Sequence, residues 1–198
     1  SQVVLATSSG FSGGYEKSNF SFSASVLAGE DTGMERDYDW TSACFEEDPA
    51  SPEEIGKNAG KGAVRRLNPK KANSGQVPVI YDPRVSGGLI QHLSGAISGA
   101  SVARGTSFLK DQLNQLIFSP HLNVVDDPHR KRGPRSRPFD GEGAQTKARK
   151  IIEDGILTSW LLDSRSARQL ELSSTGHASR GIGGPPSPGP TNLYLEAV

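Results

Sequence analysis

The chain has 198 residues, of which 34% are hydrophobic and 7% aromatic, and its 22 basic side chains balance its 22 acidic ones. A chain of this length forms one domain or two small ones and can bury a core, although its apolar inventory is small. A net charge of zero argues against a partner such as duplex DNA, which requires a clear basic excess.

Three further features of composition restrict the class of protein. The single cysteine, Cys44, excludes an intramolecular disulfide, and no apolar run is long enough to span a membrane or direct secretion, so we expect a cytoplasmic protein. The 23 glycines exceed the average usage of about 7% and predict many turns. The charges are segregated, since residues 1–50 are mainly acidic whereas residues 51–80 and 121–150 are mainly basic.

The first part of the chain predicts antiparallel strands. Residues 3–6 and 20–26 are expected strands, because the second segment alternates with a period of two, and the glycine-rich residues 8–14 are expected to turn between them. Residues 35–40 form a plausible third strand that carries its aromatic side chains on one face and its acidic side chains on the other.

The first helix is predicted from its N-terminal signals. Ser51 can cap the helix, Pro52 suits the first helical position, and Glu54 completes a capping box. Apolar residues then recur at helical intervals, which predicts a helix over residues 52–67.

The middle of the chain predicts a strand and two further helical segments. Residues 77–81 have the composition of a buried strand, followed by a turn at Asp82 and Pro83. Residues 89–100 form one apolar stripe of a second helix whose small residues predict a close neighbour on the other face. Residues 108–118 are a third amphipathic segment.

The last part predicts a long loop, a hairpin and a short helix. Residues 126–143 are dense in proline, glycine and charge, as in functional or disordered loops. Residues 151–162 with a turn at Gly155 predict the hairpin, and residues 164–170 the short helix. Residues 181–190 are expected to be an unanchored linker, followed by a strand at 191–196 without a later partner. The fold class is α+β, with antiparallel strands at both ends and two to three helices in the middle.

No complete catalytic motif is present. The four histidines lack the spacing of metal ligands, and Cys44 has no basic neighbour, so a buried thiol is expected. Asp126, Asp127 and His129 could bind a cation, although a solvated turn around Pro128 explains them more simply.

A basic run could bind phosphate or a peptide carboxylate. Without interleaved aromatic residues and with four acidic residues beside it, it is equally explained as a loop held by its own ion pairs, and nucleic acid is an improbable partner. The run consists of Arg130, Lys131, Arg132, Arg135 and Arg137.

Three stretches resemble the TldD/PmbA family, most closely its PmbA/TldE subunit type. They are residues 95–110 (GAISGASVARGTSFLK), residues 125–143 (VDDPH to RPFDGEG) and residues 152–177, which begin IEDGILTSWLLDSRSARQL. The resemblance covers most of residues 30–198. It implies a cytosolic bacterial protease, TldD with TldE, that degrades small or unfolded peptides and matures a peptide antibiotic. The family also carries the older description of DNA gyrase modulator.

The resemblance implies that this chain lacks the family's zinc ligands. In the TldD subunit a helix with the motif His-Glu-x-x-x-His binds zinc, and a later cysteine assists. Here Gln91 stands for the first histidine, His92 for the glutamate and Ala96 for the second histidine. Glutamine is a poor zinc ligand, alanine is none, and histidine cannot replace the carboxylate base. We therefore expect no metal and no catalytic residue in this chain, and zinc in a TldD-like partner.

The resemblance also implies a domain division and partners. Residues 1–75, including the helix at 52–67, correspond to a portion of the central domain, and residues 76–198 to the first part of a truncated C-terminal domain, as in an internal piece of a longer protein. The implied partners are a TldD-like catalytic subunit and a small or unfolded peptide, and a homodimer is also conceivable. The candidate contact residues are Arg104, His129, Arg130, Arg132, Asp140 and Glu142.

Two alternative functions remain open from the sequence. The chain could be a hydrolase in its own right through another site formed by His129, Asp140 and Glu142. It could instead modulate DNA gyrase or bind DNA through residues 130–137. Whether the chain is itself an enzyme therefore stays open at this point.

Overall fold

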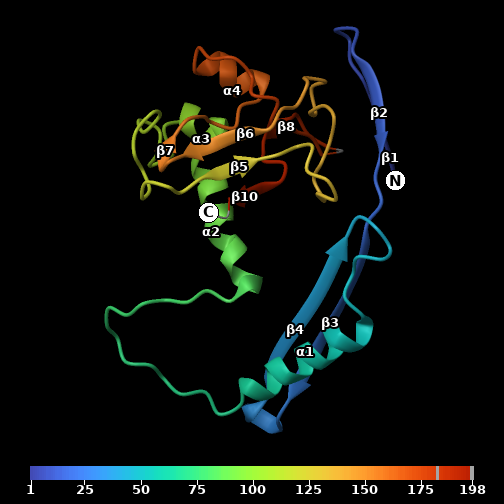
Figure 1. Cartoon of the computed structure of the whole chain (residues 1–198), viewed down its shortest axis with the longest axis vertical. Coiled ribbons are helices and arrows are strands. Elements are labelled where there is room, and N and C mark those ends of the chain that lie inside the picture. Colours follow the sequence, from blue (N-terminus) through green and yellow to red (C-terminus); the bar gives the residue numbers. More distant parts are fainter. Residues whose placement is uncertain (182, 197–198) are drawn as a thin grey trace. The chain divides into compact units, whose positions relative to one another are not determined.

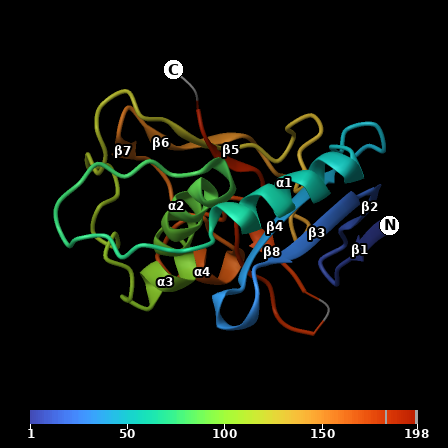
Figure 2. The same cartoon turned by 90° about the horizontal axis from the view of Figure 1, so that it is seen from below.

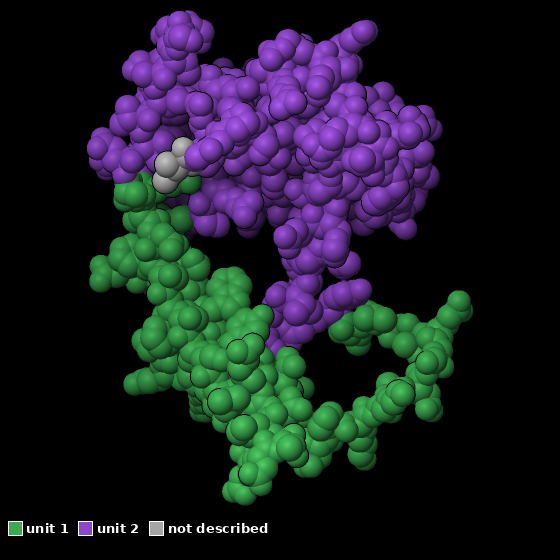
Figure 3. Space-filling model, turned by 180° about the vertical axis from the view of Figure 1, so that it is seen from behind, with its two compact units in different colours: residues 1, 17–80 green, residues 2–16, 81–198 purple. Residues whose placement is uncertain are grey.

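The structure, a computed structural model, describes residues 1–181 and 183–196. Two compact units are present, one made of residue 1 with residues 17–80 and the other of residues 2–16 with residues 81–198 (Figure 3). Both units contain helices and antiparallel strands, which confirms the α+β class. In the described part of the chain, none of the helices has the length and apolar character needed to cross a bilayer.

The first unit is a hairpin with a helix along it (Figures 1 and 2). Strand β3 (Phe20–Ala28) pairs antiparallel with β4 (Glu35–Ala43), and a short 3₁₀ turn, η1 (Asp31–Gly33), connects them. Helix α1 (Pro52–Arg65) follows, with the Ser51 side chain accepting a hydrogen bond from the Glu54 backbone N–H at 3.2 Å. The predicted strands at 20–26 and 35–40 and the predicted helix start are therefore confirmed.

Strand β4 turns its acidic face inward. Asp37 is only 3% exposed and forms an ion pair with Arg66 (Nε to Oδ2, 3.4 Å), whereas Tyr38 and Trp40 on the other face are about half exposed. Helix α1 contributes Ile55, Ala59 and Ala63 as its buried residues. Gly62, which belongs to the same helix, lies directly against the Asp37 side chain and has no room for a Cβ atom.

The second unit begins with a separate hairpin. Strand β1 (Gln2–Ala6) pairs antiparallel with β2 (Ser12–Glu16), and the rings of Phe11 and Tyr15 pack edge-on against Phe139 with centroids 4.9 and 5.4 Å away. The predicted turn through residues 8–14 was too long, because strand β2 already begins at residue 12. Gly13 fits there since Phe11 and Phe139 leave no space for a larger side chain.

A four-stranded antiparallel sheet forms the centre of the second unit, in the order β10-β5-β6-β7 (Figure 1). Its strands are β5 (Val124–Asp126), β6 (Arg149–Glu153), β7 (Ile156–Leu157) and β10 (Leu193–Leu195). The predicted hairpin around Gly155 is present, although its second strand is shorter than expected. Strand β10 pairs with β5, which precedes it by far in the chain, so the last predicted strand finds its partner earlier in the sequence.

The segment predicted to be a linker is partly anchored. Strand β8 (Ala178–Ser179) pairs antiparallel with β9 (Ser187–Pro188), and the Gly189 N–H donates to the His177 carbonyl at 2.9 Å. The expectation of an unanchored linker over 181–190 was therefore wrong for residues 187–189, and residue 182 lies outside the described residues.

Three helices complete the second unit. The predicted turn at Asp82 and Pro83 is instead the start of helix α2 (Pro83–Ala96). The Asp82 side chain caps this helix by accepting a hydrogen bond from the Arg84 N–H, and Pro83 occupies the first helical position. Helix α3 (Gly99–Ala103) follows it, and helix α4 (Ser164–Gln169) confirms the predicted short helix at 164–170.

The predicted helix over 89–100 is interrupted after Ala96. The Leu161 N–H donates to the Ile97 carbonyl at 3.0 Å, and the Gly99 N–H donates to the Leu161 carbonyl at 2.8 Å. A Cβ atom on Gly99 would lie 2.7 Å from Ser166 Oγ, so the expected close neighbour exists at this glycine. Gly87, Gly88 and Gly95 have no atom near such a position, so the rest of the small face is open.

The core of the second unit lies between these helices and the sheet. Its buried members are Leu93, Ala96, Ile97, Val102, Leu109, Val124, Ile151, Ile152, Leu157, Trp160, Leu161, Leu162 and Ala167.

Two predicted elements are absent. Residues 77–81 form no strand and are exposed, Ile80 to 97%, because no strand pairs with them. Residues 108–118 form turns rather than a helix, because their backbone forms hydrogen bonds with strand β7 and with the turn before it. The Asn114 N–H donates to the Leu157 carbonyl at 2.7 Å, and the Ile117 N–H donates to the Gly155 carbonyl at 2.9 Å.

The contact between Gly62 and Asp37 predicts opposite effects of one substitution at two sites of helix α1. Gly62→Ala places a Cβ atom 2.8 Å from Asp37 Cγ, which displaces a buried ion-paired side chain and costs about 1–3 kcal/mol of unfolding free energy. Gly60→Ala meets no atom within 4 Å and should add about 0.5–1 kcal/mol, because alanine favours helix. Urea unfolding followed by circular dichroism measures both, and equal stability of the two variants would contradict the packing described.

Candidate functional site

The three positions of the predicted zinc motif lie along helix α2 but do not form one cluster. Gln91 and His92 are exposed, whereas Ala96 is 7% exposed and belongs to the core. Gln91 and His92 are adjacent in the helix, so their side chains leave it in different directions. These side chains do not fit a zinc ion, because a glutamine amide is a poor zinc ligand, a methyl group is none, and His92 offers a single imidazole.

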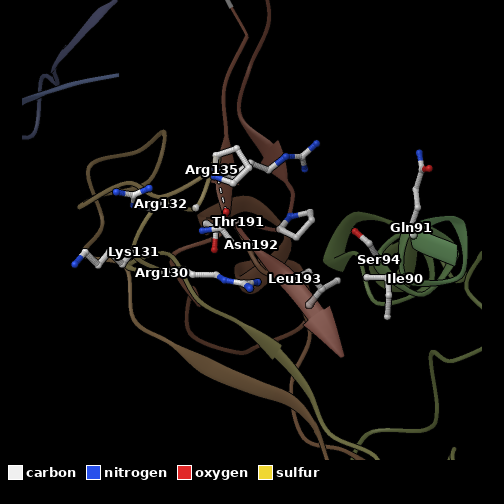
Figure 4. Close-up of a pocket in the computed structure, with 14 residues that line it drawn as sticks. Ile90, Gln91, Ser94, Arg130, Lys131, Arg132, Arg135, Thr191, Asn192 and Leu193 are labelled. Atoms are coloured by element: carbon white, nitrogen blue, oxygen red, sulfur yellow. Dashed lines mark hydrogen bonds between the residues drawn. The ribbon is translucent and has the colours of Figure 1, made fainter. Parts of the chain in front are cut away.

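Gln91 lines a cavity of the second unit that has a volume of about 840 Å³. One wall is helix α2, and the other is the loop that follows strand β5 together with the start of strand β10 (Figure 4). This volume lies within the range of about 300–1,000 Å³ that is usual for ligand pockets. The lining residues are Gly87, Ile90, Gln91, Ser94, Arg130, Lys131, Arg132, Gly133, Pro134, Arg135, Pro190, Thr191, Asn192 and Leu193.

Asn192 fixes the shape of the loop wall. Its side-chain oxygen accepts a hydrogen bond from the Arg135 N–H at 3.0 Å, and its amide nitrogen donates to the Asp127 carbonyl at 2.7 Å and to Ser136 Oγ at 2.9 Å. A Cβ atom on Gly133 would lie 2.7 Å from that amide nitrogen, so only glycine fits there. The loop is therefore a shaped wall rather than a disordered segment.

The basic side chains of the loop point in two directions. Figure 4 shows the guanidinium groups of Arg130 and Arg135 extending toward helix α2, while Lys131 and Arg132 extend away from it. Arg130 lies over the ring of Tyr194, with 4.4 Å between its Cζ atom and the ring centroid. The cavity therefore presents two positive charges on the side that faces helix α2.

The acidic residues beside the loop have other partners. Asp126 bonds to His177 and Thr191, Asp127 accepts from the His129 N–H at 2.8 Å, and the Asp140 and Glu142 carboxylates accept from backbone N–H groups. One interpretation of the sequence was a loop held by its own ion pairs. Within the described residues, none of these four carboxylates forms an ion pair with Arg130 or Arg135.

His129, Asp140 and Glu142, the candidates for a separate hydrolytic site, make separate contacts. Asp140 is 2% exposed and accepts from the N–H groups of Glu142 and Ala144, both at 2.9 Å, and of Ala178 at 3.1 Å. Glu142 accepts from the Ser164 N–H at 2.9 Å, and His129 Nε2 bonds to Thr146 Oγ1 at 3.1 Å. Both carboxylates therefore accept hydrogen bonds from backbone N–H groups and fix the conformation of the chain around them.

Arg104, the remaining candidate, lies away from the loop cavity. It lines a smaller hollow of about 210 Å³ next to helix α4, together with Asp163, Arg165 and residues 185–188. The structure therefore brings Gln91, Arg130 and Arg132 to one cavity and places Arg104 at another.

Sequence reasoning missed a buried polar cluster behind the loop. Asp126 is fully buried, and its Oδ2 atom is 3.1 Å from His177 Nε2, while its Oδ1 atom accepts from the Thr191 N–H at 2.8 Å. Thr175 Oγ1 bonds to His177 Nδ1 at 2.7 Å. The expected solvated turn was wrong for Asp126, because its partners lie 51 and 65 positions away, beyond the reach of any local pattern.

Other candidate metal ligands are also dispersed. Within residues 1–181 and 183–196, no three His, Cys, Asp or Glu side chains gather as a group able to hold a metal ion. Cys44, expected to be buried, is partly exposed at the end of strand β4 and forms no disulfide.

The chain is an α+β protein with a cationic cavity along a helix, and comparison with known proteins identifies its family. Residues 1–67 match the PmbA/TldA metallopeptidase central domain, and residues 74–198 match the PmbA/TldA metallopeptidase C-terminal domain. The chain belongs to the PmbA/TldD metallopeptidase family. The predicted division between residues 75 and 76 stays a prediction.

Curated relatives support this assignment. The chain is 44% identical over 175 residues to the metalloprotease PmbA of Escherichia coli O157:H7 and 40% identical over 175 residues to a PmbA homologue of Haemophilus influenzae. Each alignment covers 88% of this chain but 39% of the relative. The chain thus spans about two fifths of the length of the curated relatives that it matches.

Solved structures share the fold. A candidate modulator of DNA gyrase from Bacteroides thetaiotaomicron superposes with a TM-score of 0.85 at 28% identity, over 96% of this chain and 41% of that one. TldE from Thermococcus kodakarensis superposes with a TM-score of 0.84 at 21% identity, over 98% of this chain and 44% of that one, which shows the fold alone.

The buried cluster behind the loop predicts a large difference between two neighbouring carboxylates. Asp126→Asn replaces an acceptor of three buried donors by an amide, which leaves donors facing each other and should cost about 2–4 kcal/mol of unfolding free energy. Asp127→Asn keeps the oxygen that accepts from the His129 N–H and should change stability by less than about 0.5 kcal/mol. Denaturant unfolding measures both, and similar costs would show that the cluster does not hold this region.

Proposed function

We propose that this chain is part of a PmbA/TldE-type subunit of a cytosolic TldD/TldE metalloprotease complex, in which it binds peptide but holds no catalytic zinc. The observation that carries the proposal is that Gln91 and Ala96, which the resemblance aligns with the two zinc histidines, lie on helix α2 and offer no imidazole. The catalytic zinc then belongs to the TldD-type partner.

The donor groups at these positions support the first part of the proposal. Zinc in peptidases takes imidazole nitrogen or carboxylate oxygen ligands in a tetrahedral arrangement. Gln91 offers a neutral amide, and the Ala96 methyl group is packed in the core. His92 is a single imidazole, and a single ligand does not complete a site.

The charge beside Gln91 supports the same reading. Arg130 and Arg135 face the cavity that Gln91 lines, and the flanking carboxylates are bonded elsewhere. Positive charge of this kind raises the energy of a bound divalent cation, and it lowers the energy of a bound anion. The cavity thus favours an anionic group of a peptide over a metal ion.

The alternative functions have weaker support. A hydrolytic site built on His129, Asp140 and Glu142 would need a carboxylate free to act on water, whereas Asp140 and Glu142 bond to backbone N–H groups. Binding of duplex DNA would use residues 130–137, but the chain as a whole has no net charge.

A peptidase assay separates a partner subunit from an enzyme. The full-length protein alone should release no fragments from an unfolded peptide in the presence of zinc, and should contain far less than one zinc per chain. With a TldD-type subunit the pair should cleave the peptide, and His92→Ala in this chain should leave that cleavage unchanged, because a lone imidazole holds no zinc and His92 is not among the residues that line the cavity.

The control is the same pair with a zinc-ligand variant of the TldD-type subunit, which should abolish cleavage. Zinc-dependent cleavage by the full-length protein alone would contradict the proposal. His129→Ala, Asp140→Asn and Glu142→Gln would then show whether that activity comes from the second group of residues.

A further inference from the structure

We infer that the cavity between helix α2 and the 130–135 loop is a carboxylate-binding site that holds a peptide by a negatively charged group, with Arg135 as its main ligand. This inference rests on the proposed function for the choice of a peptide as the molecule that carries the carboxylate. The site itself is argued from the geometry of the loop.

Arg135 is anchored by its backbone and not by its side chain. Its N–H donates to Asn192 Oδ1 at 3.0 Å, which fixes the position from which the side chain starts. Its guanidinium group forms no hydrogen bond or ion pair with any described residue. Figure 4 shows it extending toward helix α2, into the space that Gln91 borders.

The nearest carboxylates of the chain do not reach this charge. Asp126, Asp127, Asp140 and Glu142 flank the loop in sequence, and each is bonded to a backbone N–H group or to His177. A guanidinium group offers donors in a planar fork that matches a carboxylate. A positioned arginine without an internal partner is therefore suited to an external one.

The cavity around this charge also has apolar and neutral polar groups. Ile90 and Leu193 give the cavity apolar surface, while Gln91, Ser94 and Thr191 give neutral hydrogen-bonding groups. Apolar walls with a few polar groups are typical of sites for small molecules and peptides. A nucleic-acid site would instead need basic side chains spread along a groove, whereas here the Lys131 and Arg132 side chains extend away from helix α2.

The test measures binding of short peptides by the full-length protein, without a TldD-type partner and without zinc. The probe is a peptide of glycine, serine and alanine with a free C-terminal carboxylate and an N-terminal dansyl label, which carries no carboxylate of its own. The same peptide with an amidated C-terminus and an amidated version with one internal glutamate distinguish the two sources of a carboxylate. The fluorescence anisotropy of each gives its Kd.

The free-acid or the glutamate peptide should bind at least about tenfold more tightly than the amidated peptide, because a charge-assisted hydrogen bond is lost with the amide. Arg135→Gln should remove this difference. Lys131→Gln is the matched control, since it removes the same charge from the same loop at a side chain that extends away from helix α2, opposite to Arg135, and it should keep the difference.

Equal affinity for the charged and amidated peptides, or absence of binding, would overturn the inference. So would an equal effect of the two variants, which would indicate general attraction to a basic loop. Tighter binding of a short DNA duplex than of the carboxylate peptides, lost in Arg135→Gln, would assign the site to nucleic acid. None of these results involves zinc or cleavage, so failure here is distinguishable from failure of the proposed function.

Discussion

The pairing of strands β5 and β10 is the constraint on which the candidate site depends. Strand β5 ends at Asp126, which bonds to the Thr191 backbone, and Asn192 in turn bonds to the Asp127 carbonyl and to the loop beyond it. These contacts join two parts of the chain that lie more than 60 positions apart in the sequence. Without these contacts, the 130–135 loop would not be held in the conformation that forms the cavity wall opposite helix α2.

This constraint links stability to function. Asp126 bonds to Thr191 and His177, the Asn192 side chain bonds to the 130–135 loop and its neighbours, and Asp140 accepts from three backbone N–H groups. The acidic residues that could have neutralised the loop are thereby committed to the fold. The positive charge of Arg130 and Arg135 remains available to a ligand, and this is what makes the cavity suited to an anion.

Local signals in the sequence predicted the elements that depend on near neighbours. The Ser51–Pro52 start of helix α1, the alternation in strands β3 and β4 and the turn at Gly155 follow from side chains and backbone within a few positions. The Asp82–Pro83 pair has the same helix-start signal as Ser51–Pro52, a capping residue followed by proline, and it begins helix α2. The turn predicted there was wrong because this signal was not weighed at Asp82.

Elements that depend on distant partners were not predictable in this way. Residues 77–81 have the composition of a strand but no strand beside them, and residues 108–118 have a helical pattern that backbone bonds to Gly155 and Leu157 override. The same limit applied to the site, since no spacing in the sequence joins Asp126 with His177 or Arg135 with Asn192. The basic run itself was visible, but the lack of an ion pair at the Arg130 and Arg135 guanidinium groups within the described residues was not.

In the proposed function, this member of the PmbA/TldD family holds no zinc at Gln91 and Ala96, because neither side chain is a usual zinc ligand. Residues 1–67 and 74–198 match the two PmbA/TldA domains, and a cationic cavity lies along helix α2 at Gln91. In the proposed complex, the catalytic zinc is therefore bound by the TldD-type subunit and not by this chain. Anomalous X-ray scattering at the zinc edge from crystals of the full-length protein with a TldD-type subunit locates the metal directly. The account predicts zinc only in the TldD-type subunit, and a zinc peak beside Gln91 of this chain would contradict it.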